Sequence, residues 1–306
     1  MPELPDVECY VHALRDRLTG SSLLGIRISS PFLLRSVAPT VDEVSGLAVT
    51  DVSRLGKRIV VHLQDERALV IHLMVAGRFR WAESGAKIPA RVGLAAFDFE
   101  AGTLLLTEAS KKKRASLHLV ASAQALQDHD PGGIEVLEVS WEAFDAALRQ
   151  RNHTLKRTLT DPRVFSGIGN AYSDEILHRA KLSPFKQSQK VSEEESRRLH
   201  QAVVESLRSW TDRLRTEFGD EFPGKVTAFR PDMAVHGKFG APCPECGTPV
   251  QRIRYAENEA NYCPTCQTDG KLLADRALSR LLKKDWPRTL EELEKLKDET
   301  KTRLAK

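Results

Sequence analysis

Four cysteines form two closely spaced pairs near the end of the chain. Cys243 and Cys246 make the first C-x-x-C pair, and Cys263 and Cys266 make the second, after an interval of sixteen residues. Each pair can bend into a tight knuckle that presents two sulfurs to one tetrahedral ion, and this spacing is typical of zinc. Because four thiolates leave no open position for water, the pattern predicts one structural, non-catalytic zinc ion per chain.

The chain end is a second candidate for chemistry, because the sequence starts Met1-Pro2-Glu3. Initiator methionine is normally removed when the second residue is small, so we expect the mature chain to begin with the imino group of Pro2. A chain-end amine titrates near roughly 8, against about 10.4 for lysine, so much more of it is unprotonated at neutral pH. Such an amine can attack an aldehyde carbon to form an iminium, and Glu3 could shuttle the protons. Taken alone, these residues are also compatible with a disordered chain end.

The segment GIGNAYSDEIL places Gly167 and Gly169 just before a helix that is predicted to start near Asn170. Backbone N–H groups at a helix N-terminus bind phosphate readily, and glycines let a phosphate approach the backbone closely. With no strand before it, the segment is not a dinucleotide-binding fingerprint. It therefore predicts either a phosphate site or an ordinary helix cap.

Charge and cysteine usage narrow the class of protein. The net charge is only +4, but residues 151–190 hold eight Lys or Arg against three Asp or Glu, which indicates either a phosphate-binding patch or a solvated helix face. No run approaches the roughly 18 apolar residues of a membrane span, and the N-terminus lacks the features of a signal peptide. Clustered cysteines with metal spacing favour a reducing compartment. We expect a cytoplasmic protein, nucleoid-associated if the source is bacterial, with no membrane partner.

The elements that must position these residues can be predicted from hydrophobic periodicity. Residues 5–19 have a helical repeat, with Cys9 on the apolar side as a buried thiol, and residues 21–122 alternate with period two, which predicts an antiparallel β-sandwich. Helices are predicted over 140–150, 153–159, 170–180 and 191–214, the last with a capping box from Ser192 to Glu195 and Val191 as a hydrophobic staple. Two more helical segments follow the cysteines, one around 274–286 and one capped by Thr289 and Glu292. The fold class is α+β, with four parts at 1–128, 138–222, 236–267 and 268–306.

Five motifs occur in an order that resembles the formamidopyrimidine-DNA glycosylase/endonuclease VIII family. They are PELPDVE at 2–8, LGKR at 55–58, HLMVAGRF at 72–79, GIGNAYSDEIL at 167–177, and VHGKFGAPCPECGTPV with CPTC at 235–266. The resemblance spans residues 2 to about 267. It implies an N-terminal β-sandwich with an N-terminal helix, a helix–two-turn–helix domain with a zinc finger, and damaged DNA bound in the cleft between the lobes. It also implies that the target nucleotide is flipped out of the duplex.

The family's site residues carry over to the matching positions. By this resemblance, Pro2 is the Schiff-base nucleophile, Glu3 is the proton donor, and Lys57 grips phosphate at the lesion and assists elimination. Lys156 and Asn170 resemble the family's DNA-contacting lysine and asparagine, and the four cysteines match its zinc ligands. These assignments make the glycine turn a DNA-binding element.

The chain departs from the family in the finger, where Asn258 replaces an arginine that holds phosphate. An amide cannot form the bidentate ionic clamp of an arginine. Arg252 and Arg254 lie on the same predicted hairpin, and strand alternation places both on one face. We therefore expect Arg254 to contact DNA, the alternative being that the two arginines merely solvate the finger.

Two further departures concern the void left by a flipped base and the chain's length. The family fills the void with a methionine in HLGM and with an arginine and a phenylalanine in DPRRFG. The matching segments here read HLMV and TEASKKKRAS, so that Met74 or Val75 remains as a wedge and Lys111–Arg114 offer only charge. A tail of about 40 residues extends past the usual family end.

These features predict a monomeric DNA-repair glycosylase with AP-lyase activity, in which Pro2 displaces an oxidised base and elimination from the imine nicks the strand. The missing void-filling residues favour a close variant that acts mainly on abasic sites or single strands. A non-catalytic DNA- or RNA-binding zinc protein is the alternative from another class. Such a protein would have no need of a proline imine beside a glutamate.

Overall fold

A computed structural model of the chain describes residues 1–224, 226–227, 230–255, 258–274 and 285–304. The chain divides into two compact units. The first unit contains residues 1–135 and 207–228, and the second contains 136–206 and 229–306. Each unit is described by itself.

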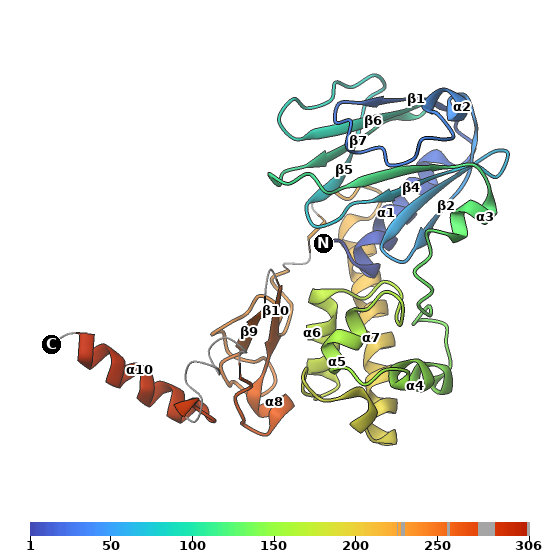
Figure 1. Ribbon diagram of the computed structural model, residues 1–306. Coiled ribbons are helices and arrows are strands. Elements are labelled where there is room, and N and C mark those ends of the chain that lie inside the picture. Colours follow the sequence, from blue (N-terminus) through green and yellow to red (C-terminus); the bar gives the residue numbers. More distant parts are fainter. Residues whose placement is uncertain (225, 228–229, 256–257, 275–284, 305–306) are drawn as a thin grey trace. The chain divides into compact units, whose positions relative to one another are not determined.

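The first unit is built on two antiparallel four-stranded sheets (Figure 1). One sheet has the order β1-β6-β7-β5, with bounds Leu23–Ile28, Gly93–Phe99, Gly102–Glu108 and Gly77–Ala82. The other has the order β2-β3-β4-β8, with bounds Val49–Leu55, Arg58–Leu63, Ala68–His72 and Ser116–Val120. Short helices α2 (Val41–Val44) and α3 (Ala123–Gln127) complete the connections. The predicted β-sandwich is confirmed.

Strand alternation explains how the second sheet buries its core face. Ile59 pairs with Ile71, and Val61 pairs with Leu69, and all four are buried in the core of the sandwich. The tight turn between β3 and β4 has positive φ at both central residues, 58° at Asp65 and 59° at Glu66. This is the backbone geometry of the two-residue turns that match the twist of paired strands.

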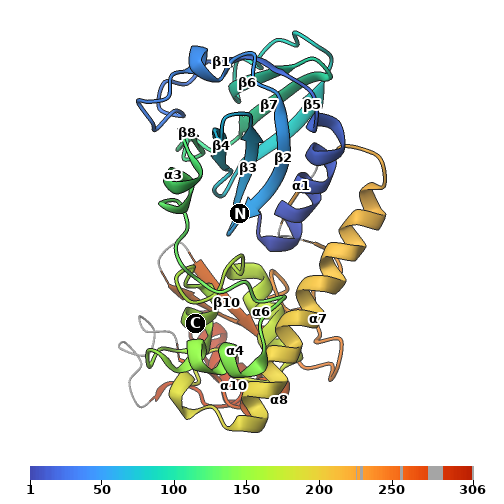
Figure 2. The same cartoon turned by 90° about the vertical axis from the view of Figure 1, so that its right-hand side faces the viewer.

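Helix α1 (Leu4–Leu18) packs against the sandwich through the stripe that its sequence predicts (Figure 2). Tyr10, Leu14 and Leu18 are fully buried, and Cys9 is a buried thiol as expected. The ring of Tyr10 meets Phe79 edge-on at 5.5 Å, and its hydroxyl accepts a hydrogen bond from the Phe79 amide. These contacts fix the helix whose first turn carries the chain end.

The second unit begins with helices α4 (Trp141–Arg149), α5 (Leu155–Thr160) and α6 (Asn170–Arg179) and a 3₁₀ turn at Ser188–Lys190. Helix α7 (Glu193–Phe218) starts with the predicted capping box, in which the Ser192 amide donates to Glu195 and the Glu195 amide donates to Ser192. Residues 207–228, which include the end of α7, belong to the first unit. Phe222, just beyond α7, lies against Tyr10 and Trp81 of that unit.

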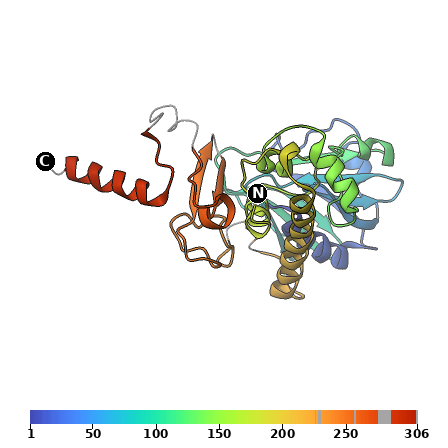
Figure 3. The same ribbon diagram turned by 90° about the horizontal axis from the view of Figure 1, so that it is seen from below.

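The cysteine module is a two-stranded hairpin, β9 (Gln251–Tyr255) and β10 (Asn258–Tyr262), followed by α8 (Pro264–Thr268) (Figure 3). In the tail, the helix predicted around 274–286 lies largely outside the described residues. Helix α10 (Leu290–Leu304) begins after Thr289, whose hydroxyl accepts the Glu292 amide as predicted. Among the helices that the structure describes, none has the length and apolar character needed to cross a membrane.

Candidate functional site

Glu3 is fixed at the start of α1 by reciprocal hydrogen bonds. It is the N-cap residue, and its amide donates to Oδ2 of Asp6 at 3.0 Å, which completes a capping box. Pro5 occupies the first turn, where a missing N–H costs nothing. Glu3 is only 2% exposed, and Pro2 beside it is also buried. Pro2 and Glu3 are therefore part of an ordered helix start and not of a disordered chain end.

Arg54 joins the turn that carries Lys57 to this helix. The turn lies between β2 and β3, and Gly56 within it has a φ of 61°, which favours glycine. The Arg54 guanidinium donates to the Gly56 carbonyl at 2.9 Å and to Glu8 of α1 at 2.8 Å. It also pairs with Glu135 at 2.5 Å, and its side chain is 10% exposed. One buried cation thus holds α1, the Lys57 turn and residue 135 together.

The terminal amine, Glu3 and Lys57 share one electrostatic environment. Burial lowers the pKa of the terminal amine of Met1; the Glu3 carboxylate opposes this shift, and the charge of Lys57 reinforces it. Burial also lowers the pKa of Lys57, again against the effect of Glu3. The amine of Met1 stands in for the Pro2 imino group that methionine removal would leave. An environment of this kind favours the neutral, nucleophilic form of an amine.

His72 ends β4 and pairs with Arg58 of β3. The charge of Lys57 also acts on it. Burial lowers the pKa of His72 to about 4, and the charges of Arg58, Lys57 and His118 act in the same direction. The imidazole is therefore neutral at physiological pH. It can donate or accept a hydrogen bond there without adding charge.

Two loops present the residues that stand where the family fills the void. In the first loop, Met74 has a φ of 52° and Val75 is 55% exposed. The second loop folds around Glu108, which is 1% exposed and accepts the amides of Arg114 and Ala115 at 2.9 and 3.1 Å. Its lysines at 111 and 112 are exposed. The loop is thus an anchored basic segment without an aromatic residue.

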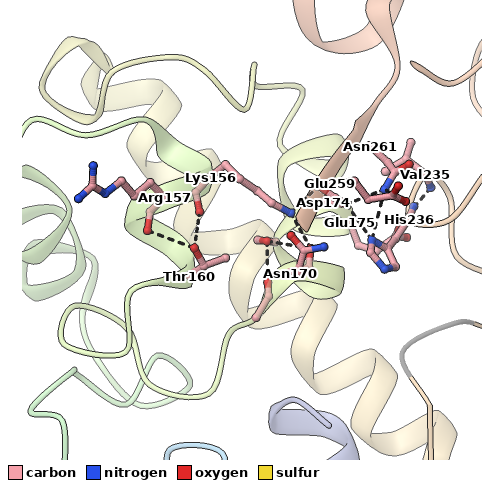
Figure 4. Close-up of polar contacts among 12 residues, drawn as sticks. Lys156, Arg157, Thr160, Asn170, Asp174, Glu175, Val235, His236, Glu259 and Asn261 are labelled. Atoms are coloured by element: carbon pink, nitrogen blue, oxygen red, sulfur yellow. Dashed lines mark hydrogen bonds and ion pairs between the residues drawn. The ribbon is translucent and has the colours of Figure 1, made fainter. Parts of the chain in front are cut away.

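The glycine turn lies at the start of α6. Gly167 has a φ of 82°, Gly169 is the N-cap residue, and Asn170 is the first helical residue. Lys156 lies behind this turn, 3% exposed, with its Nζ 2.5 Å from the Asn170 carbonyl and 2.6 Å from Oδ1 of Asp174 (Figure 4). The ammonium thus pairs with the buried Asp174 carboxylate, which needs a counter-charge in such a place. The DNA contact expected of Lys156 stays a prediction.

The four cysteine sulfurs form a cluster that fits a tetrahedral metal ion. The Sγ atoms of Cys243, Cys246, Cys263 and Cys266 all lie within 4.8 Å of one another. Two of the separations are 3.4 Å, between Cys246 and Cys263, and 4.0 Å, between Cys243 and Cys266. A zinc ion with four bonds to sulfur of about 2.3 Å requires separations of roughly 3.8 Å. Donor set and spacing therefore fit zinc.

Side chains of α6 attach the finger to the helical part of the second unit. Glu175 accepts the amides of Ala234, Val235 and His236 at 2.8 to 2.9 Å. At the other end of α6, Nε2 of His178 lies 3.2 Å from the sulfur of Cys243. Contacts of this kind orient metal ligands.

The finger arginines lie on one face of β9, as strand alternation predicts, with Ile253 buried on the other. Arg254 is 66% exposed, and its Nε lies 4.0 Å from a carboxylate oxygen of Glu259. Arg252 lies 3.9 Å from the same oxygen and covers the ring of Phe239 at 4.3 Å. The structure describes the backbone of Asn258, which starts β10 opposite Tyr255.

Sequence reasoning missed most of the residues that hold these sites in place, namely Arg54, Glu108, Asp174, Glu175, His178, His236 and Asn261. One signal was available. Asp174 and His178 lie four residues apart, and therefore on one face of a predicted helix. Polar residues on a buried helix face require partners, which predicts contacts with another element.

Comparison with known proteins places three family models along the chain. Residues 1–126 match the formamidopyrimidine-DNA glycosylase N-terminal domain, residues 135–213 match the H2TH domain of the same enzymes, and residues 240–268 match the zinc finger found in FPG and IleRS. Together they cover the sandwich, the glycine turn and the four cysteines.

Individual relatives agree with these models over most of the chain. The formamidopyrimidine-DNA glycosylase of Heliobacterium modesticaldum is 32% identical over 277 residues, which cover 87% of this chain and 100% of that protein. The Thermus thermophilus enzyme is 32% identical over 282 residues, covering 88% and 100%. Among solved structures, Lactococcus lactis Fpg with abasic-site DNA has a TM-score of 0.76 at 25% identity, covering 87% of this chain and 99% of that one. MutM with DNA containing carbocyclic 8-oxo-G has a TM-score of 0.77 at 26% identity, covering 87% and 100%.

Proposed function

Because the chain belongs to the formamidopyrimidine-DNA glycosylase family, which are DNA N-glycosylases with AP-lyase activity, we propose that it removes oxidised bases through a covalent intermediate on Pro2. The observation that carries this proposal is the shared environment of the terminal amine, Glu3 and Lys57. Burial lowers the pKa of the Met1 amine, which stands in for the Pro2 nitrogen, and the pKa of Lys57, and the Glu3 carboxylate opposes both shifts. A nucleophile and a proton shuttle are thus supplied at one place.

The reaction follows from these groups once Met1 is removed. The Pro2 nitrogen forms a bond to C1′ of the sugar as the bond from C1′ to the damaged base breaks, and the base leaves with the bonding electrons and takes a proton from water. Glu3 accepts the proton that the Pro2 nitrogen loses and gives it to the ring oxygen, so that the sugar opens and an iminium remains. The iminium acidifies the C2′ hydrogen; loss of that proton expels the 3′-phosphate and nicks the strand. Water then hydrolyses the imine and restores the free amine.

Phosphate binding is assigned to residues of both units. Lys57 would hold the phosphate at the lesion, and the turn from Gly167 to Asn170 would bind a second phosphate at the N-terminus of α6. Lys156 supports that turn from behind. Arg254 would supply the grip that Asn258 cannot give. We expect the four cysteines to hold one structural zinc ion, which contributes folding free energy and takes no part in the reaction.

The basic loop around Glu108 favours a second candidate substrate. A duplex with a flipped base leaves a hole, and the exposed residues of this loop are cationic, not aromatic. Lys111 and Lys112 can neutralise phosphates on a single strand as well as on a duplex. Abasic sites and single-stranded DNA are therefore included as substrates of the same chemistry.

Borohydride trapping tests the proposal. The protein is mixed with oligonucleotides that carry an abasic site or an oxidised base, as duplex and as single strand, and the adduct is mapped by peptide mass spectrometry. We expect the adduct at the Pro2 nitrogen, at least a hundredfold slower trapping for Pro2→Gly, and no adduct on the fraction of molecules that retain Met1. Pro31→Gly, in an exposed loop, is the matched control and should trap at the wild-type rate. An adduct on a lysine would overturn the assignment of Pro2.

A further inference from the structure

A buried polar chain runs through the second unit from the glycine turn to the finger hairpin (Figure 4). Its members are almost inaccessible to solvent: Asp174 is 1% exposed, Asn261 1%, Lys156 3% and His236 5%. They come from α5, α6, the segment before the first cysteine pair, and β10. Polar groups in such a place are stable only when their hydrogen bonds are made, so their geometry is tightly constrained.

Asp174 is the centre of this chain because its two oxygens serve opposite sides. Oδ1 accepts Nζ of Lys156 at 2.6 Å. Oδ2 lies 2.8 Å from Nδ1 of His236 and accepts Nδ2 of Asn261 at 3.2 Å. An ionised carboxylate only accepts hydrogen bonds, so Nδ1 of His236 carries a hydrogen.

The two ends of this hydrogen-bonded network lie at the elements that are proposed to bind phosphate. On one side, Lys156 also donates to the carbonyl of Asn170, the first residue of the turn helix. On the other side, Nδ2 of the Asn261 side chain donates to a carboxylate oxygen of Glu259 at 3.2 Å. Glu259 in turn lies within 4.0 Å of the guanidinium of Arg254. A single carboxylate therefore connects the glycine turn to the finger arginines.

We infer that Asp174 is a positioning residue for DNA binding, which holds the glycine turn and the finger hairpin in the arrangement that receives consecutive phosphates. The inference rests on the proposed function. The inference predicts a change in DNA affinity opposite in sign to the change expected from the charge of Asp174 alone. Asp174 is an anion close to a site that should attract an anion, so its charge alone weakens phosphate binding. If the placement of the glycine turn and the finger hairpin matters more than the charge of Asp174, then removing that charge will weaken DNA binding and not strengthen it.

The decisive variant is Asp174→Asn, measured in the full-length zinc-loaded protein. Dissociation constants for a duplex with a stable abasic-site analogue are determined by fluorescence anisotropy over a series of salt concentrations. We expect the constant to rise at least tenfold and the salt slope to become shallower, because fewer phosphates are neutralised. Borohydride trapping at saturating abasic DNA should stay within twofold of wild type, because Pro2 and Glu3 belong to the first unit. Glu205→Gln, which breaks an exposed pair with Arg179 in the same unit, is the matched control.

A pair of substitutions at His236 keeps the test decisive if Asp174→Asn does not fold. Gln can still donate an N–H to Asp174, whereas Leu cannot. We expect His236→Gln to bind within about threefold of wild type and His236→Leu to lose at least tenfold in affinity, with equal zinc content. Tighter or unchanged binding by Asp174→Asn overturns the inference, and so does equal binding by the two His236 variants. Failure of the proposed function has a different signature, namely no adduct from wild type at saturating DNA.

Discussion

Replacing Arg54 with methionine should weaken both the first unit and its chemistry. The hydrogen bonds of the guanidinium include one to Glu8, one to the Gly56 carbonyl and two to Glu135. Methionine keeps much of the side-chain volume but offers no donor. The carboxylates of Glu8 and Glu135 would then lose their shared counter-ion.

The size of the effect can be worked out from exposure. Breaking a buried ion pair by removing one partner costs about 3–5 kcal/mol. Arg54 is 10% exposed, but Glu8 is 24% exposed and Glu135 is 42% exposed, so water can solvate the carboxylates that remain. We therefore expect the lower end, about 3 kcal/mol, which for a unit of this size lowers its melting temperature by roughly 6–12 °C. Lys57 should also lose its fixed place, because the Gly56 carbonyl is released.

Arg15 provides a matched control for this experiment. It also joins α1 to β2, through Asp51 at 2.7 Å and the Val52 carbonyl at 2.5 Å. Its pair is exposed, however, with side-chain exposures of 48% and 49%. Exposed pairs contribute about 0–1 kcal/mol, so Arg15→Met should shift the melting temperature by no more than a few degrees.

The assay is calorimetry of both variants, followed by trapping on saturating abasic DNA. We expect Arg54→Met to trap at least tenfold more slowly than Arg15→Met, measured below both melting temperatures. Arg54→Lys, which keeps the charge but not the fork of donors, should fall between them. Equal melting temperatures for Arg54→Met and Arg15→Met would refute the reasoning about burial. Equal trapping rates would show that the placement of Lys57 does not depend on the hydrogen bonds of Arg54.

Three further predictions concern the finger and the sandwich. Cys263→Ala should lose the zinc ion and weaken DNA binding while the melting transition of the first unit persists; metal analysis and calorimetry check this, and full DNA affinity without metal would contradict it. Arg254→Ala should weaken binding of lesion DNA at least tenfold and Asn258→Arg should tighten it, both at unchanged zinc content, as measured by anisotropy; an Arg254→Ala variant with wild-type affinity would remove the finger from the clamp. The pKa of His72 is about 4 in the folded chain, below about 6.5 when unfolded, so the free energy of unfolding should fall as pH drops from 6.5 to 4. Urea titrations of wild type and His72→Gln should show a weaker pH dependence in the variant, and identical slopes would exclude His72 as a source.

Local patterns in the sequence predicted the features that depend on near neighbours. The stripe of α1, the turn after β3, the capping box at Ser192 and the two cysteine pairs all involve residues within a few positions of one another. Their geometry follows from helical or strand periodicity and from turn chemistry. The ordered start at Glu3, which caps α1, was not predicted, because the sequence placed the helix over 5–19 and left Pro2 and Glu3 compatible with a disordered end.

Residues that hold the sites in place could not be predicted in this way. Arg54 and Glu135 are 81 positions apart, and Asp174 and His236 are 62 positions apart. Nothing in the local sequence selects such partners, because they are chosen by the packing of whole elements. Lys156 is an example, because its ammonium lies 2.6 Å from Oδ1 of Asp174, which is 18 positions further along the sequence and one helix away.

The first unit is made of two segments of chain, and this has a consequence for synthesis on the ribosome. Its core includes Val226, and Phe222 packs against it, so residues 1–135 leave the ribosome without the last part of their own core. About 90 further residues must be translated first, which takes roughly 5–18 s at 5–20 residues per second. During that interval the faces of Tyr10 and Trp81 that later meet Phe222 are open to other apolar chains. This apolar surface of the nascent sandwich stays uncovered until residues 222–226 have emerged.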